Sequence, residues 1–160
     1  MNFLQDINVL EARKYLTNKV LRTPVRRLKW LEEIVNVPVW AKLEQYQHTG
    51  SFKFRGAMFA LRNHPKEMPV IAASAGNHGL AVAYVCQKLG IKANICLPAN
   101  ASRLKRQRIL NLEAGLIEYG SSLDEAIVHA QKLALANNWR FISPYNDVDL
   151  ISASGSIAQE

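Results

Sequence analysis

From residue 70 onward, short apolar runs alternate with stretches of helical periodicity in units of similar length. Each run is short enough for a buried strand and is followed by a turn signal or a polar segment. The runs are VIAAS (70–74), ANICLP (93–98), LIEYG (116–120) and RFISP (140–144). Strand–helix–strand units join parallel strands by right-handed crossovers. The pattern therefore predicts an α/β fold, a doubly wound parallel sheet with helices on both faces.

Three helices are expected between these strands. The first runs roughly from His78 to Leu89 and is followed by Gly90, and the second runs roughly from Ser102 to Ala114 and is followed by Gly115. Glycine is favoured just after a helix because the chain often leaves it with a positive φ. Both glycines are therefore predicted helix stops.

The third helix starts at SLDE, where Ser122 is a predicted cap and Glu125 can reach back to the cap's N–H group. Apolar residues then recur at helical spacing and predict one buried stripe. The stripe consists of Leu123, Ala126, Ile127, Ala130, Leu133 and Ala134.

The first third of the chain has a different organisation. An amphipathic helix is expected from Asp6 to Lys19, a strand at VPVWAKLE (37–44), and a further helix beginning near Ser51. NHPKEMP (63–69) carries two prolines, which indicates a hinge or a domain boundary.

Length and composition fit one globular domain, since the 160 residues are 49% apolar. The net charge of +7 raises the possibility of nucleic-acid binding, because RLKRQR (103–108) concentrates four basic side chains. No interleaved aromatic residues accompany that run. A solvated basic helix face, with Leu104, Ile109 and Leu112 turned elsewhere, explains it better, and no nucleic-acid partner is expected.

Membrane and metal sites are not expected either. The longest apolar run, LAVAYVC (80–86), is too short to span a bilayer, and the N-terminus lacks a basic stretch followed by an apolar one. Cys86 and Cys96 lie in apolar segments, which suits reduced, buried thiols. The four histidines lack ligand spacing. The sequence thus indicates a soluble cytoplasmic protein.

One lysine lies in a chemically unusual context. In GSFKFRGA (50–57), Lys53 is between Phe52 and Phe54, and Ser51 is positioned to cap the predicted helix. A helix N-terminus and an apolar surrounding both disfavour the ammonium form, so a neutral, nucleophilic amine becomes accessible near pH 7. Lys53 is therefore a candidate for covalent attachment to an aldehyde, although an ordinary surface lysine is the alternative.

A second candidate site is SAGNHG (74–79), between the first strand of the sheet and its helix. Small residues there let backbone N–H groups converge on an anion, at the carboxyl end of a strand where ligands of such sheets bind. The plainer alternative is a helix-capping turn with Asn77 as the cap.

These segments resemble a known family. KLEQYQHTGSFKFRGA (42–57) and SAGNHGLAVAYVCQKLGIKANICLP (74–98) are similar to the serine/threonine dehydratases (threonine ammonia-lyases) and serine racemases, fold-type-II enzymes that depend on pyridoxal 5'-phosphate (PLP). The resemblance extends to ISPYNDVDLISASGSIAQE (142–160) and covers the N-terminal half of such enzymes. Ser143-Pro144 stands where the family usually has His-Pro.

The resemblance implies specific roles. Lys53 would hold PLP as a Schiff base and act as the catalytic base, with Phe52 against the pyridine ring and Asn77 bonded to the ring's phenolic oxygen. The substrate carboxylate would bind the loop after the strand, made by Ser74, Ala75, Gly76, Asn77 and His78. Racemases of this family carry serine where Ala75 stands, so the resemblance favours dehydration.

The implied function is removal of water and ammonia from a β-hydroxy amino acid such as serine or threonine, giving a 2-oxo acid. Residues 1–64 would begin the large PLP-binding domain, residues 65–150 would form the small domain, and residues 151–160 would start the return to the large one. Because such enzymes are longer, this chain is expected to be weakly active or inactive alone. The resemblance also implies exposed apolar surface around the helix from Asp6 to Lys19 and around the strand near Trp40, and such surface favours a homodimer. A non-catalytic remnant or binding module of the same fold is the alternative.

Overall fold

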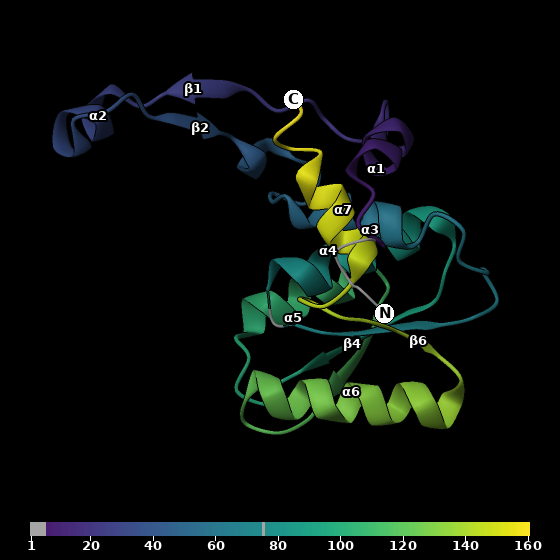
Figure 1. The fold of residues 1–160 in the computed structure, drawn as a ribbon. Helices are drawn as coiled ribbons and strands as arrows, with labels where there is room; N and C mark the ends of the chain where they lie inside the picture. The colour runs from purple at the N-terminus through teal and green to yellow at the C-terminus, as the bar shows by residue number, and fades with distance from the viewer. Residues whose placement is uncertain (1–5, 75) are drawn as a thin grey trace.

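The computed structural model describes residues 6–74 and 76–160, and its centre is a parallel sheet of four strands (Figure 1). The strands lie in the order β5-β4-β3-β6. They are β3 (Val70–Ala73), β4 (Ala93–Leu97), β5 (Gly115–Glu118) and β6 (Arg140–Ile142). Every neighbouring pair is parallel, which confirms the fold class and all four predicted strands.

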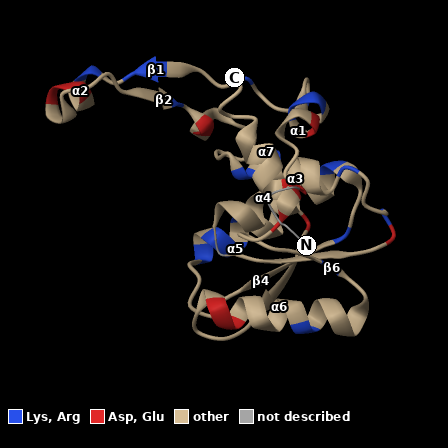
Figure 2. Cartoon of the chain, in the orientation of Figure 1, with Lys and Arg blue, Asp and Glu red and all other residues tan. Residues whose placement is uncertain are grey.

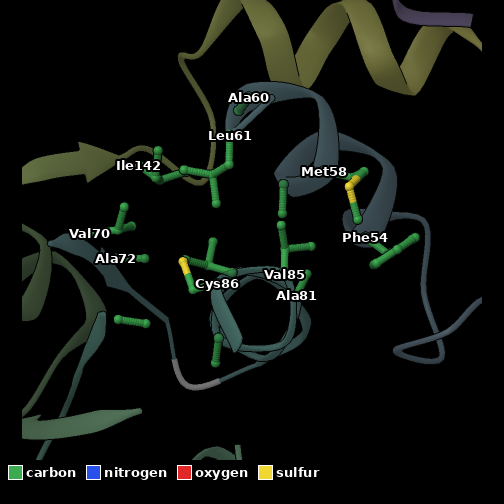
Figure 3. Packing of buried hydrophobic residues seen from close by; sticks show 14 of the residues in the cluster. Phe54, Met58, Ala60, Leu61, Val70, Ala72, Ala81, Val85, Cys86 and Ile142 are labelled. Carbon is green, nitrogen blue, oxygen red and sulfur yellow. The ribbon is translucent and has the colours of Figure 1, made fainter. Parts of the chain in front are cut away.

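Both faces of the sheet are buried. In β3, Val70 and Ala72 belong to a large apolar cluster, whereas Ile71 and Ala73 belong to a smaller one on the opposite face. This alternation follows the two-residue period of a strand. Helices α3 (Lys53–Ala60) and α4 (Asn77–Leu89) supply the large cluster (Figure 3), and α6 (Leu123–Asn137) covers the other face (Figure 1).

Two of the predicted helix ends are confirmed, and a third is wrong. Gly90 caps α4 with φ 72°, and Ser122 and Glu125 form the complete capping box of α6, as expected. The prediction for Gly115 was wrong, because α5 (Arg103–Leu110) ends earlier and Gly115 begins β5. A Cβ on Gly115 would lie only 2.5 Å from Asn94 Oδ1, so close strand packing accounts for the glycine.

The basic run lies in α5 with its charged side chains exposed or half-buried, as expected for a solvated face. Ile109 packs into the core and Leu112 packs against it, but Leu104 is 71% exposed. Leu104 therefore does not share their orientation, contrary to the prediction. The thiols of Cys86 and Cys96 are both buried and free.

The N-terminal third forms a helical layer and an arm. Helix α1 (Val9–Leu16) is shorter than predicted because Asn8 caps it through a bond from the Glu11 N–H group. Helices α1 and α3 pack against α7 (Val148–Gly155). A Cβ on Gly56 would lie 2.9 Å from Leu150, so α3 and α7 approach closely at that glycine.

The arm consists of β1 (Val25–Arg27), α2 (Lys29–Val35) and β2 (Trp40–Lys42), and it extends away from the sheet in Figure 1. Strands β1 and β2 pair antiparallel, and the short helix η2 (Glu44–Tyr46) follows them. The sequence did not predict α2. Apolar surface on the arm confirms the expectation near Trp40: Trp30 is 63% exposed, Ile34 71% and Trp40 62%.

No helix within residues 6–74 and 76–160 has both the length and the apolar character needed to cross a bilayer.

Candidate active site

Lys53 is the first residue of α3, at the edge of the helical layer nearest the β6–α7 connection. Its Nζ donates a hydrogen bond to the carbonyl oxygen of Pro144 at 3.1 Å and lies 5.2 Å from the centre of the Phe52 ring. The side chain is half-buried, and this loss of solvent lowers the pKa of the amine from its usual value. The structure thus supports a lysine whose neutral form is easier to reach than at an open surface.

The two phenylalanines that flank Lys53 in sequence lie in different environments. Phe52 is 39% exposed and remains beside the amine, whereas Phe54 is fully buried. The Phe54 ring packs edge-on against His48 and Tyr84, with ring centres 4.9 Å and 5.8 Å away. Of the two phenylalanines that were expected to surround Lys53, only Phe52 therefore lies beside its amine in the described part of the chain.

Ser51 does not cap α3, so that prediction was wrong. Phe52 occupies the cap position without a side-chain bond, and the Ser51 hydroxyl is buried without a hydrogen-bond partner in the described residues. The first turn is closed by the backbone instead: the Phe54 N–H bonds to the Ser51 carbonyl at 3.4 Å and the Arg55 N–H to the Phe52 carbonyl at 3.0 Å.

The loop after β3 leads directly into α4. The Ser74 hydroxyl accepts a bond from the Gly76 N–H at 3.1 Å, and Gly76, rather than Asn77, takes the cap position of α4. Asn77 is the first helical residue and its side chain is exposed. Ala75, which was also predicted to belong to this loop, lies outside the described residues. The first turn of α4 offers N–H groups and the positive end of the helix dipole to an anion.

His78 is buried in that first turn and forms a specific bond. Its Nε2 lies 3.2 Å from the Ile142 carbonyl oxygen. A carbonyl oxygen only accepts, so Nε2 carries the proton and Nδ1 is left as an acceptor, which has no partner in the described residues. Burial, with the Lys53 charge nearby, lowers the pKa of the imidazole from 6.5 to about 4. The ring is therefore neutral near pH 7.

This buried imidazole predicts a pH-dependent stability. The folded pKa lies below the unfolded one, so between pH 6.5 and about 4 the unfolded chain binds more protons and stability falls as pH falls. We expect His78 to remove about 2 kcal/mol of unfolding free energy between pH 7 and pH 5. Urea unfolding of the wild type and His78→Gln measures it, since glutamine keeps a donor without titrating. Parallel pH curves for the two proteins would contradict the assignment.

The connection between β6 and α7 joins the two candidate sites. Lys53 and His78 come from different helices, yet their side chains donate to carbonyl oxygens of Pro144 and Ile142, two residues apart. Between them, the Ser143 hydroxyl accepts bonds from the N–H groups of Tyr145 and Asn146, which makes this connection a tight turn. These contacts could not be predicted from the sequence, because backbone carbonyl groups carry no side-chain signature.

Sequence analysis also missed Arg55, two residues after the lysine. Arg55 is fully buried and bonds to Glu44 at 2.9 Å and to Glu160 at 2.7 Å. Burial by itself would raise the pKa of both carboxyl groups. The bonds from Arg55, with Thr23 helping at Glu44 and Lys42 at Glu160, outweigh burial and hold both pKa values below their usual range. This ionic cluster fixes α3 against η2 and the end of the described chain.

Known proteins are similar to this chain in sequence and in fold. A sequence model of the family described as "Pyridoxal-phosphate dependent enzyme" matches residues 16–160. A catabolic L-threonine dehydratase of Staphylococcus aureus is 36% identical over 157 residues, which are 96% of this chain and 45% of that protein. The chain therefore spans less than half the length of this curated relative.

Solved structures agree with the sequence comparison. The processed form of threonine deaminase isoform 2 from Solanum lycopersicum superposes with a TM-score of 0.87 at 28% identity, over 98% of this chain and 44% of that one. A PLP-dependent aspartate racemase superposes with a TM-score of 0.86, also at 28% identity, over 98% of this chain and 49% of that one. The described fold is thus shared by enzymes named for different reactions.

Proposed function

Because the chain belongs to the pyridoxal-phosphate-dependent enzyme family, we propose that Lys53 is its cofactor-binding lysine and that the protein serves the dehydration of a β-hydroxy amino acid. Serine and threonine are the proposed substrates, with a 2-oxo acid and ammonia as products. The observation that carries this proposal is the Lys53 amine, half-buried with a lowered pKa and held at 3.1 Å from the Pro144 carbonyl. Its relative from Staphylococcus aureus is named for the same reaction class.

The residues around Lys53 fit PLP. An amine with a lowered pKa is more easily deprotonated, and the neutral amine reacts with an aldehyde. The Phe52 ring beside it is exposed enough to pack against a planar heterocycle. The Asn77 side chain, exposed at the start of α4, is proposed to bond to the phenolic oxygen of the cofactor. Bound PLP would supply an electron sink for charge that develops at the substrate Cα.

The loop at the start of α4 is proposed to bind the substrate carboxylate. Asn77 and His78 contribute backbone N–H groups, and Gly76 adds a third once its N–H group leaves the Ser74 hydroxyl. The helix dipole favours an anion there. The His78 ring takes no direct part in this contact, because its one N–H group already bonds to Ile142 and its neutral Nδ1 would repel a carboxylate. We therefore assign the ring a positioning role and its backbone the binding role.

Lys53 has a second proposed role as the base that removes the Cα proton. To act, its Nζ must leave the Pro144 carbonyl, and a neutral amine can then accept the proton from substrate. The lowered pKa favours this step, because less free energy is needed to have the amine deprotonated near pH 7. The β-hydroxyl group then takes up a proton and leaves as water, and hydrolysis of the resulting imine releases ammonia and the 2-oxo acid.

The chain is shorter than its relatives, and this affects the activity that we expect of it alone. It spans 45% of the relative from Staphylococcus aureus, so we propose that it is weakly active or inactive alone. Residues 1–64 are proposed as part of a large domain, 65–150 as a small domain and 151–160 as the start of the return to the large one.

The exposed apolar side chains of the arm support homodimer formation. A binding module without catalysis is the second candidate.

Reductive trapping tests the proposal. The protein is incubated with PLP, reduced with borohydride and digested, and the peptides are weighed by mass spectrometry. We expect the pyridoxyl group on Lys53, with little label on exposed Lys29 or Lys132, and slow or no release of 2-oxo acid from threonine or serine. Release of 2-oxo acid, however slow, that is lost in Lys53→Ala would exclude the binding module. Labelling spread evenly over surface lysines contradicts a cofactor site at Lys53.

A further inference from the structure

The basic face of α5 has no part in the function proposed above. Its cations differ in their surroundings: Arg106 pairs with Glu118 at 3.0 Å and also bonds to the Ala99 carbonyl. Within residues 6–74 and 76–160, neither Lys105 nor Arg108 forms an ion pair. The concentration of basic residues on α5 is visible in Figure 2.

Lys105 and Arg108 share a small hollow with the start of α4. The hollow has a volume of about 100 Å³ and no acidic residue among its described lining residues. These are Gly76, Asn77, Leu80, Lys105, Arg108 and Ile109. Helix α4 has 13 residues, so its N-terminus adds a partial positive charge to that of the two side chains.

A neighbouring hollow adds a hydroxyl that lacks a partner. It measures about 330 Å³ and shares Leu80 and Arg108 with the first hollow. Thr49 lines it, is 6% exposed, and its Oγ1 has no hydrogen-bond partner in the described residues. A buried polar group without a partner costs free energy, so a ligand atom that bonds to it is favoured there.

The positive charge around the first hollow is larger than the negative charge of one carboxylate. Two side-chain cations and about half a unit of charge from the helix end surround the first hollow. A single carboxylate at the start of α4 leaves more than one positive charge unmatched, and a second carboxylate reduces this excess to about half a unit. The apolar walls from Leu80 and Ile109 suit a short hydrocarbon link. The volume of the first hollow is well below the roughly 300–1,000 Å³ of pockets for drug-sized ligands, so this hollow suits a small ligand.

We propose that Lys105 and Arg108 bind the second carboxylate of a small dicarboxylic ligand whose first carboxylate lies at the start of α4. The identification of that ligand as the amino-acid substrate, hence an acidic β-hydroxy amino acid, rests on the function proposed above. The binding of a dicarboxylate does not rest on it. Lys105 and Arg108 then determine which substrate is preferred, without taking part in the chemistry at Lys53.

Calorimetric titration without PLP tests this site. Succinate and propionate are the probes, at matched ionic strength, because they differ by one carboxylate. We expect the wild type to bind succinate at least about tenfold more tightly than propionate, and Arg108→Gln or Lys105→Gln to weaken succinate binding about tenfold. Arg103→Gln is the matched control: it removes the same charge from an exposed position of α5 that lines neither hollow, and binding should be unchanged.

Several results would overturn the proposal. Equal affinity for propionate and succinate would show a site for one carboxylate, and equal losses in Arg103→Gln and Arg108→Gln would show a general effect of net charge. Tighter binding of inorganic phosphate than of succinate would replace the dicarboxylate with a phosphorylated ligand. Urea unfolding confirms that each variant is folded. Labelling of Lys53 without succinate binding refutes this inference alone, and succinate binding without labelling refutes the cofactor site alone.

Discussion

Arg55→Leu is expected to lower the free energy of unfolding by about 3–5 kcal/mol at pH 7. The leucine leaves the carboxylates of Glu44 and Glu160 without their arginine, although their side chains are only 11% and 14% exposed. Glu160 keeps its ion pair with Lys42 at 2.6 Å, but Glu44 has no other ion-pair partner in the described residues. An unpaired charge in such a position is costly because solvent cannot replace the lost partner. Urea unfolding at 25 °C measures the change.

The pH dependence of that loss provides a second measurement. Arg55 depresses both carboxyl pKa values, so its stabilising effect is present above their ordinary value of 4.5 and is lost as pH falls below it. The difference between wild type and Arg55→Leu should therefore shrink on acidification from pH 7 to pH 3.5. A difference that stays constant over this range would contradict the ionic cluster.

Arg62→Leu is the matched control for Arg55→Leu. Arg62 pairs with Asp149 at 2.9 Å and with Glu11 at 3.5 Å, but its side chain is 20% exposed and that of Glu11 is 51% exposed. Water replaces such partners more readily, so a loss of about 1 kcal/mol or less is expected. Equal losses of unfolding free energy in the two variants would show that the burial of the Arg55 cluster does not increase its contribution to stability.

Gly79→Ala is expected to destabilise the protein by about 3 kcal/mol, at the upper end of typical overpacking costs. A Cβ at this position would lie 2.6 Å from the Ser74 carbonyl oxygen and 3.0 Å from the Ile95 side chain. The first contact is to backbone, so it is relieved only by moving α4 away from β3. Because that movement also displaces the N–H groups of the loop, weaker binding of succinate is expected together with the lower stability.

Gly76→Ala is the control from the same loop. Its Cβ would have a nearest neighbour at 4.0 Å, the Ser74 hydroxyl, which is an ordinary contact. We expect less than about 1 kcal/mol of destabilisation, measured by urea unfolding alongside Gly79→Ala. If Gly76→Ala is as damaging as Gly79→Ala, conformational freedom of the loop rather than close packing explains the glycines.

The centre of the sheet could be predicted from sequence because β3 and β4 are buried on both faces. Continuous apolar runs such as VIAAS mark such strands wherever they occur, and the helix caps at Gly90 and Ser122 depend on residues within one turn. Gly115 shows the limit of local signals. Its position after a helical pattern indicated a stop, but its contact with Asn94 on the neighbouring strand explains it.

The sequence by itself determined the parallel sheet, the segments that carry the candidate site and, through motif resemblance, the family. These features depend on apolar periodicity and on residues close together in the chain. Only the tertiary structure decided which groups face Lys53 and His78, the carbonyl oxygens of Pro144 and Ile142. It also placed Arg55 between two carboxylates more than 100 residues apart in sequence. Backbone acceptors and long-range ion pairs leave no local pattern, because they arise only when distant segments pack together.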